Sequence, residues 1–144
     1  MSSFLLDTNI PSEIIKTKPD PMVNSWASAQ DNAALHISVI TIGELRKGIA
    51  VLPGGKRRTS LEGWLDNGLI PSFKGRVLPV TQAIADRWGN LSARRQVAGR
   101  PLSMADGLIA ATALENGLTL VTRNISDYEN LGVTILNPWE QIKV

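Results

Sequence analysis

The 144-residue sequence contains no cysteine, only one histidine and no long apolar run. Without cysteine the chain has no disulfides, no thiolate nucleophile and no cysteine-based zinc site. No stretch of about 18 consecutive apolar residues occurs, so we expect no membrane-spanning helix. The N-terminal segment lacks the basic region and the longer apolar core of a secretory signal. These absences favour a cytoplasmic protein that does not associate with a membrane.

The composition is that of an ordinary globular protein. Hydrophobic residues make up 43% of the chain and charged residues 19%, which argues against disorder. A chain of this length can bury a sizeable core as one unit, and we assign residues 1–144 to a single domain. The formal net charge is +2, which permits nucleic acid as a partner but does not require it.

Short apolar runs alternate with helical patterns along the chain. We expect strands at residues 4–6, 35–39, 76–80, 118–122 and 133–136, and helices at residues 10–17, 21–29, 41–52, 57–68, 82–98 and 104–116. This alternation predicts right-handed βαβ units, and therefore an α/β fold whose mostly parallel central sheet carries helices on both faces. In such sheets ligands bind beyond the carboxyl ends of the strands.

The segment FLLDTNI, residues 4–10, is an apolar strand pattern that stops at Asp7. Asp, Thr and Asn are common helix caps, because their side-chain oxygens accept hydrogen bonds from free backbone N–H groups. Alternatively, Asp7 is a functional carboxylate presented at the carboxyl end of the first strand. Position alone does not separate these interpretations.

Three further acids follow predicted strands or begin helices at the same edge. Glu44 borders the apolar stripe of its helix. Asp106 completes a capping box with Ser103, yet the segment after it is apolar almost all round, which indicates a buried helix. Asp127 follows the strand at residues 118–122, where a local turn would also explain it.

Together these acids favour a metal site. Four carboxylates at one edge, Asp7, Glu44, Asp106 and Asp127, would repel one another unless a positive charge lay between them. Oxygen ligands without His or Cys suit a hard cation, Mg²⁺ or Mn²⁺. Such a cation can polarise a phosphoryl oxygen and orient an in-line attack. The pattern therefore predicts metal-dependent phosphodiester hydrolysis, with Thr8, Asn9 and Thr122 orienting the ligands or water.

The motifs LLDTN, ITIGEL, GRPLSMADGLIAATAL, LVTRNISDY and NPW follow one another in this order. The ordered set resembles the PIN domain, and more closely the VapC-type toxin ribonucleases of type II toxin–antitoxin modules. The resemblance implies an α/β/α sandwich and a metal-dependent endoribonuclease that often cleaves structured RNA such as transfer RNA. It also implies a homodimer, a cognate antitoxin as inhibitor, and contact with DNA only through that antitoxin.

Matched motif by motif, the resemblance implies Asp7, Glu44 and Asp106 as the first three acids. The fourth position is open, because relatives carry an acid either where Asn124 stands or directly before the aromatic residue, as Asp127 does. We favour Asp127 as the acid and leave Asn124 as a ligand for a metal-held water. Whether one or two metal ions bind stays open with it.

Basic residues supply candidate contacts to RNA phosphates. They are Lys56, Arg57, Arg58, Arg94, Arg95 and Arg100. Since no aromatic residues are interleaved with them, they are equally typical of solvated helix faces. An antitoxin arginine could instead bind the acids, because guanidinium pairs well with carboxylates, with apolar anchors at Ile14, Ile15 and Leu52.

Other functions have weaker support or remain as alternatives. No G-x-S-x-G nucleophile motif occurs, and the glycine-rich segment at residues 54–58 does not match a Walker A loop. His36 lies in a strand pattern, where a structural role is more common than a catalytic one. The main alternative is a PIN-fold regulatory or binding module that acts mainly within a DNA-bound toxin–antitoxin repressor complex, without strong nuclease turnover.

Overall fold

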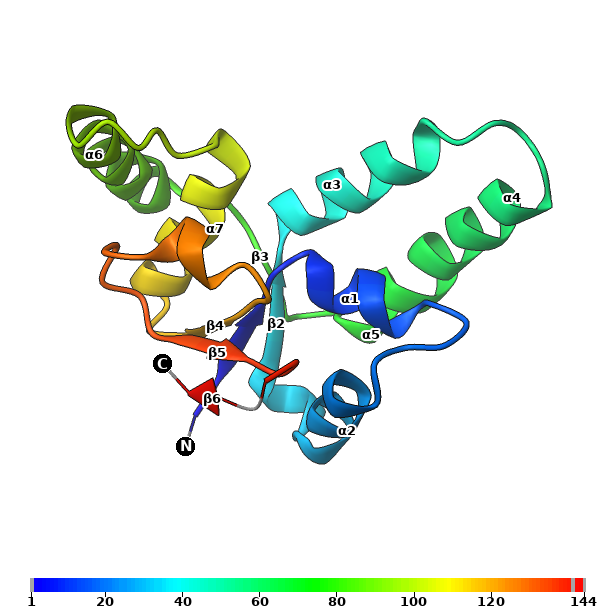
Figure 1. Cartoon of the computed structure of the whole chain (residues 1–144). Helices are drawn as coiled ribbons and strands as arrows, with labels where there is room; N and C mark the ends of the chain where they lie inside the picture. Colours follow the sequence, from blue (N-terminus) through cyan, green and yellow to red (C-terminus); the bar gives the residue numbers. More distant parts are fainter. Residues whose placement is uncertain (1, 141, 144) are drawn as a thin grey trace.

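The computed structural model describes residues 2–140 and 142–143, and within them the strands form one central sheet (Figure 1). The strands are β1 (Phe4–Leu6), β2 (Leu35–Ser38), β3 (Val77–Leu78), β4 (Thr119–Val121), β5 (Ile135–Asn137) and β6 (Ile142–Lys143). Their order across the sheet is β3-β2-β1-β4-β5-β6. Neighbouring strands from β3 to β5 are parallel, and β6 is antiparallel to β5.

Helices connect the strands and cover both faces of the sheet. They are α1 (Asn9–Ile14), α2 (Pro21–Ala29), α3 (Val39–Ala50), α4 (Lys56–Gly63), α5 (Ile70–Ser72), α6 (Gln82–Val97) and α7 (Met104–Glu115), with short 3₁₀ turns η1 (Asn32–Ala34) and η3 (Ile125–Tyr128) and a π-helical turn η2 (Trp64–Leu69). In the described part of the chain, no helix is long and apolar enough to cross a membrane.

The strand order places a topological switch point between β1 and β4. From β1 the chain proceeds outward to β2 and β3, then returns to the other side of β1 to form β4 and β5. The connections on the two sides therefore run away from each other and leave a crevice at the carboxyl ends of β1 and β4, where open α/β sheets bind ligands. Asp7 directly follows β1 and Thr122 directly follows β4.

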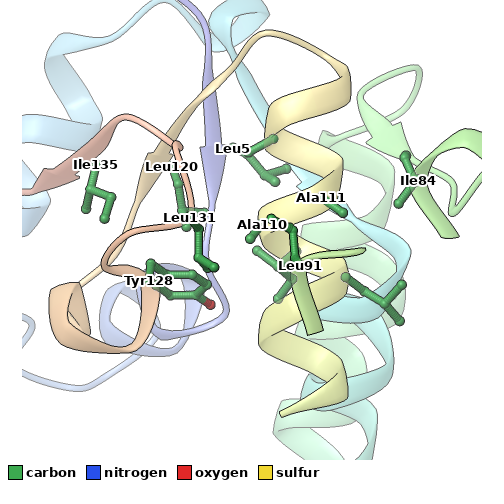
Figure 2. Packing of buried hydrophobic residues seen from close by; sticks show 12 residues of the cluster. Leu5, Ile84, Leu91, Ala110, Ala111, Leu120, Tyr128, Leu131 and Ile135 are labelled. Atoms are coloured by element: carbon green, nitrogen blue, oxygen red, sulfur yellow. The ribbon is translucent and has the colours of Figure 1, made fainter. Parts of the chain in front are cut away.

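Alternating side chains of the strands build a core on each face. On one face Leu5 and Leu120 pack with Ile84 and Leu91 of α6, with apolar residues of α7 and with Tyr128 (Figure 2). On the other face Phe4, Leu6 and Val121 pack with residues of α1 and α2 and with Phe73, which follows α5. Since successive strand side chains point to opposite faces, β1 and β4 contribute to both cores, and all their residues except half-buried Thr119 are buried.

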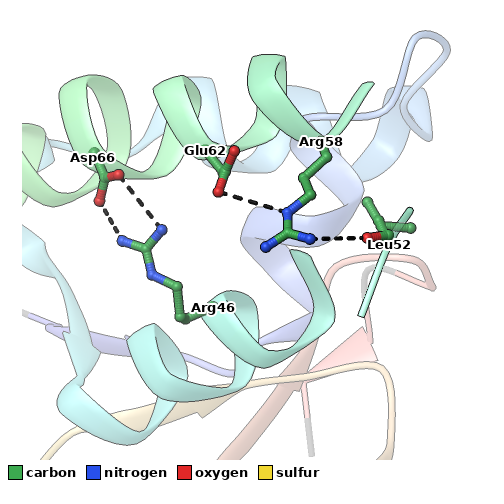
Figure 3. Close-up of polar contacts among 5 residues, drawn as sticks. All are labelled: Arg46, Leu52, Arg58, Glu62 and Asp66. Atoms are coloured by element: carbon green, nitrogen blue, oxygen red, sulfur yellow. Dashed lines mark hydrogen bonds and ion pairs between the residues drawn. The ribbon is translucent and has the colours of Figure 1, made fainter. Parts of the chain in front are cut away.

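Helices α3 and α4 extend side by side away from the sheet (Figure 1). A small separate core joins them, in which Leu45 and Ile49 of α3 pack with Leu61 of α4 and with Leu65 of η2. Arg46 of α3 pairs with Asp66, and Arg58 of α4 donates to the carbonyl oxygen of Leu52 at 3.2 Å (Figure 3). Exposed ion pairs of this kind contribute little stability, so the apolar contact holds the two helices together.

The expected α/β class, the parallel sheet and the helices on both faces are confirmed. The strand expected at residues 76–80 is only Val77–Leu78, because Pro79 has no N–H to continue the ladder. The helix expected at residues 57–68 ends at Gly63 and continues as η2. Strand β6 was not expected, since its two described residues carry no clear strand pattern.

Candidate functional site

The carboxylate of Asp7 is the buried centre of the site. The Asp7 N–H donates to the carbonyl oxygen of Val121 at 2.9 Å, which continues the pairing of β1 with β4. The side chain is only 5% exposed. Oδ1 accepts from the Thr8 N–H at 2.8 Å, and Oδ2 accepts from Thr122 Oγ1 at 2.7 Å and from Tyr128 OH at 3.1 Å. Asp7 is therefore bound mainly to side chains of a distant segment rather than acting as a simple helix cap.

Burial raises the pKa of Asp7 above its ordinary value. Hydrogen bonds from Thr122, Thr8 and Tyr128 act in the opposite direction, and the negative charge of Asp106 adds to the increase. Burial is the largest of these effects, because it disfavours the charged form of a carboxyl group. A cation next to Asp7 would reverse the balance, since it would stabilise the ionised form.

Asp106 faces Asp7 from the first turn of α7. Ser103 precedes this helix as its N-cap, and its Oγ accepts from the Asp106 N–H at 3.2 Å. The Asp106 carboxylate takes part in a different contact, because its Oδ1 accepts from Tyr128 OH at 3.1 Å. Capping thus explains Ser103, while the Asp106 side chain is turned to the same hydroxyl that contacts Asp7.

Glu44 joins the site through Thr8. Thr8 Oγ1 donates to Glu44 Oε1 at 2.5 Å and lies 3.2 Å from Thr41 Oγ1. Since the neighbouring N–H of Thr8 binds Asp7, one residue links the acid on α3 to the acid after β1. Glu44 is half-buried, as expected for a group that borders the apolar stripe of its helix.

Thr122 organises the polar groups around Asp7. Its hydroxyl donates to Asp7 and accepts from Asn9 Nδ2 at 3.2 Å and from the Asn124 N–H at 3.0 Å. Asn9 Nδ2 also lies 3.5 Å from Asp7 Oδ2, and its Oδ1 accepts from the Arg123 N–H at 3.4 Å. Thr8, Asn9 and Thr122 are thus all beside the carboxylates, whereas the side chain of Asn124 is exposed.

Asp127 does not join the other acids in the structure. Its side chain is exposed, because the η3 turn directs the next residue, Tyr128, into the core. In the described ranges, no three His, Cys, Asp or Glu side chains form a group that could hold a metal ion. Of the four carboxylates expected to converge, the structure brings Asp7 and Asp106 to the same hydroxyl, and Glu44 is connected to Asp7 through Thr8. The assignment of Asp127 stays a prediction.

Comparison with known proteins agrees with this geometry. The family model of the PIN domain matches residues 4–130. The chain belongs to the PIN domain family. It is 42% identical to the VapC ribonuclease Y4jK of Sinorhizobium fredii over 95% of this chain and 98% of the relative. It is 35% identical to the toxin FitB of Neisseria gonorrhoeae over 94% of this chain and 98% of that protein. This PIN domain is thus a member of the VapC-type toxin ribonucleases.

A solved structure supports the fold at the level of the whole chain. The structure described as FitAB bound to an IR36 DNA fragment matches this PIN domain with a TM-score of 0.88 at 32% identity. The match covers 94% of this chain and 95% of that chain. The expected α/β/α sandwich of the PIN domain is confirmed.

The basic residues of this PIN domain fall into three environments. Arg95 is buried, and its guanidinium donates to main-chain carbonyl oxygens. The expectation that Arg95 contacts RNA is corrected, because a guanidinium enclosed in this way cannot reach a phosphate. Arg58 contacts Glu62 and the carbonyl of Leu52 (Figure 3). The RNA-binding assignment stays a prediction for half-buried Arg58 and for the exposed residues Lys56, Arg57, Arg94 and Arg100.

A groove of about 720 Å³ leads away from the acids between α1, α3 and α4. Thr8 and Glu44 line it where it meets the site, and Lys16 and Arg57 add positive charge. The apolar part of its lining consists of Ile15, Leu45, Ile49, Leu52, Leu61 and Trp64. The groove of this PIN domain therefore combines an apolar lining with two basic residues, and carries the acid Glu44 where it reaches the site.

Sequence reasoning missed Tyr128 and Thr41 as members of the site. Tyr128 is the only tyrosine in the chain and lies between Ile125 and Leu131, so its apolar neighbours could have indicated a buried ring whose hydroxyl needs a partner. Thr41 lies one turn before Glu44 and is fully buried, but nothing in its local pattern separates it from a core residue.

Proposed function

We propose that this chain is the toxin of a type II toxin–antitoxin module and acts as a metal-dependent endoribonuclease. The observation that supports the activity best is the pair of carboxylates, Asp7 and Asp106, which converge at the switch point of the sheet. Relatives over nearly the whole length are named as a ribonuclease and as a toxin. The reaction would be hydrolysis of an RNA phosphodiester bond.

The donor set fits Mg²⁺, with Mn²⁺ as an alternative. All the side chains that meet at the site offer oxygen, the ligand that hard cations prefer. Mg²⁺ usually keeps several water molecules and binds one or two carboxylates together with substrate phosphates. Two converging acids therefore suffice, and Asp7 and Asp106 would hold the ion. When bound, such a cation polarises a phosphoryl oxygen and favours attack by water.

The other residues of the site would orient these ligands and handle protons. Thr122 and Thr8 hold the Asp7 carboxylate by hydrogen bonds to its two oxygens. Glu44 lies where the groove meets the site, so its carboxylate can accept a proton from a water that approaches along the groove. Asn9 keeps Thr122 oriented through its Nδ2.

Substrate binding would rest on charge. Arg57 and Lys16 line the groove that leads from the acids, and exposed Lys56, Arg94 and Arg100 can contact phosphates elsewhere on the surface. The substrate would be RNA with a defined structure, for which transfer RNA is the first candidate to test.

The partner would be an antitoxin segment that fills the groove. An amphipathic segment could bury its apolar side chains against Leu45, Ile49 and Trp64 and place an arginine near Glu44. The solved complex of FitAB on DNA supports an arrangement in which the toxin reaches DNA through its antitoxin. A homodimer and a cytoplasmic location are further predictions for this chain.

The deciding experiment measures RNA cleavage by the purified chain in Mg²⁺ and in EDTA. Wild-type protein should cleave only with metal, and Asp7→Asn and Asp106→Asn should abolish cleavage while circular dichroism shows an unchanged fold. Asp127→Asn is the matched control and should be clearly milder, because this carboxylate is exposed. Cleavage by Asp7→Asn at the wild-type rate would reject the assignment. Absence of cleavage by pure wild-type protein that still binds its antitoxin and promoter DNA would favour the regulatory module.

A further inference from the structure

We infer that Tyr128 and Arg95 form a positioning unit that sets the separation of the Asp7 and Asp106 carboxylates for metal binding. The inference rests on the proposed function, since it concerns the metal site of the ribonuclease. Tyr128 supplies the contact to both acids, and Arg95 holds the turn that carries Tyr128. Neither side chain would touch the substrate, so both are positioning residues.

Tyr128 is placed with little freedom. The ring is 1% exposed and packs in the core beside Leu120 and Leu131, with the hydroxyl directed toward helix α7 (Figure 2). Its oxygen lies 3.1 Å from Asp7 Oδ2 and 3.1 Å from Asp106 Oδ1. Burial first, and then the two negative charges, raise the pKa of Tyr128 above its ordinary value, so the phenol stays protonated.

The contact engages Oδ2 of Asp7 and Oδ1 of Asp106. The other Asp7 oxygen, Oδ1, accepts from the Thr8 N–H and keeps a second lone pair that can face a cation. A hydroxyl carries a single proton, so Tyr128 can donate fully to only one of the two carboxylates at a time. The remaining contact places oxygen lone pairs against each other and gains from a positive charge close by. This geometry therefore suits a site that two carboxylates share with a cation.

Arg95 holds the η3 turn in the position that places Tyr128 beside the two carboxylates. The Arg95 side chain is buried, and its Nε donates to the carbonyl oxygen of Arg100 at 2.9 Å. Its Nη1 donates to the carbonyl oxygens of Asp127 at 3.1 Å and Glu129 at 3.4 Å. The last two carbonyls belong to the residues on either side of Tyr128, so one guanidinium binds the main chain before and after the tyrosine.

A buried guanidinium is costly unless its donors are satisfied. Here it connects the loop after α6, through Arg100, with the η3 turn. Arg100 adds a hydrogen bond to the carbonyl oxygen of Ser126 at 3.3 Å. Two arginines thus donate hydrogen bonds to the main chain in and next to the four-residue η3 turn. This restraint suits a turn that must hold the side chain of Tyr128 in a fixed position.

Outer residues that orient metal ligands typically contribute about 10- to 100-fold to metal affinity. We therefore expect Tyr128→Phe, which removes only the hydroxyl, to weaken Mn²⁺ binding about tenfold. At saturating Mn²⁺ the cleavage rate should largely recover, because the acids themselves are intact. A purely structural role of the ring would leave Mn²⁺ affinity unchanged, since phenylalanine fills the same space.

The test is calorimetric titration of Mn²⁺ into the purified full chain, with cleavage measured across a range of Mn²⁺ concentrations. Arg95→Met should also weaken Mn²⁺ binding, and Arg95→Lys should do so with a smaller loss of stability. Gln96→Met is the matched control on the exposed neighbour and should bind Mn²⁺ like wild type. Weaker binding in Tyr128→Phe alone already supports the inference if the Arg95 variants do not fold.

The outcomes separate this inference from the proposed function. Wild-type Mn²⁺ affinity in Tyr128→Phe would overturn the positioning unit, even if the chain cleaves RNA. Weakened Mn²⁺ binding in Tyr128→Phe would support it, even if no RNA substrate is found. Wild-type affinity in every folded Arg95 variant would remove Arg95 from the unit, and a wild-type chain that binds no Mn²⁺ would overturn both proposals.

Discussion

Replacing Gly107 by alanine tests how closely α6 must approach α7 to hold Asp106 in place. Gly107 directly follows Asp106 and is buried against α6. A Cβ atom at this position would lie 2.7 Å from Trp88 Cδ1, 2.9 Å from Trp88 Nε1 and 3.2 Å from Leu102 Cδ2. An indole ring is rigid and large, so it cannot yield as the end of a flexible chain would. One of the two helices has to move.

The magnitude follows from two opposing effects. Forcing an extra carbon into a packed interior costs about 1–3 kcal/mol, while alanine gains about 0.5–1 kcal/mol over glycine in a helix. We therefore expect Gly107→Ala to lower the free energy of unfolding by about 1–2 kcal/mol. For a chain of this size the loss corresponds to a Tm lower by roughly 2–8 °C.

The assay is thermal unfolding followed by circular dichroism in EDTA, with Gly89→Ala as the matched control. Gly89 lies on α6, and an added Cβ would meet nothing within 4 Å, so this change should raise the Tm slightly. Displacement of α7 in Gly107→Ala should also weaken Mn²⁺ binding, because Asp106 moves with the helix. A Gly107→Ala variant as stable as Gly89→Ala would refute the close packing of Trp88 against α7.

Three other changes test the site and the groove. Burial raises the pKa of Asp7 above 3.8, so the free energy of unfolding of the metal-free protein should fall as pH rises through that raised pKa. In thermal melts in EDTA, Asp7→Asn should lack this fall and should be more stable than wild type at neutral pH. Asp127→Asn should retain most Mn²⁺ affinity, whereas Asp106→Asn should lose it, as titration calorimetry would show. Gly48→Glu should weaken antitoxin binding at least tenfold in pull-down or calorimetry, since Gly48 lines the groove and has open space, while Gly63→Glu outside the groove should not.

Periodic patterns in the sequence determined the architecture. The apolar runs around β1, β2 and β4 and the apolar α7 appear in the sequence as segments that must be buried, and their alternation with helices predicts the parallel sheet. The same patterns placed Asp7 at a strand end and Asp106 at a helix start. These features follow from residues close together in the chain, for which the periods of 2 and 3.6 carry the information.

The tertiary structure decided which side chains reach one another. The sequence places Asp127 and Tyr128 side by side after β4, and the family resemblance favours the acid as the ligand. The fold turns the tyrosine inward and leaves the acid exposed, because Arg95, remote in sequence, binds the carbonyls on both sides of Tyr128. Arg95 directly follows Arg94 on its helix, and such a basic pair suggests exposed charges, so the burial of Arg95 could not be inferred.

The contacts that define the site join segments far apart in the chain. Asp7 is held by Thr122 and Tyr128, and Thr8 binds Glu44. Each of these contacts depends on how the chain crosses the sheet at the switch point. It also depends on the position along the neighbouring strand at which each helix begins. Residue types and strand ends can be read from the sequence. The distances between the carboxylates are fixed only when the sheet and the helices have packed, because packing alone sets these distances to within an ångström.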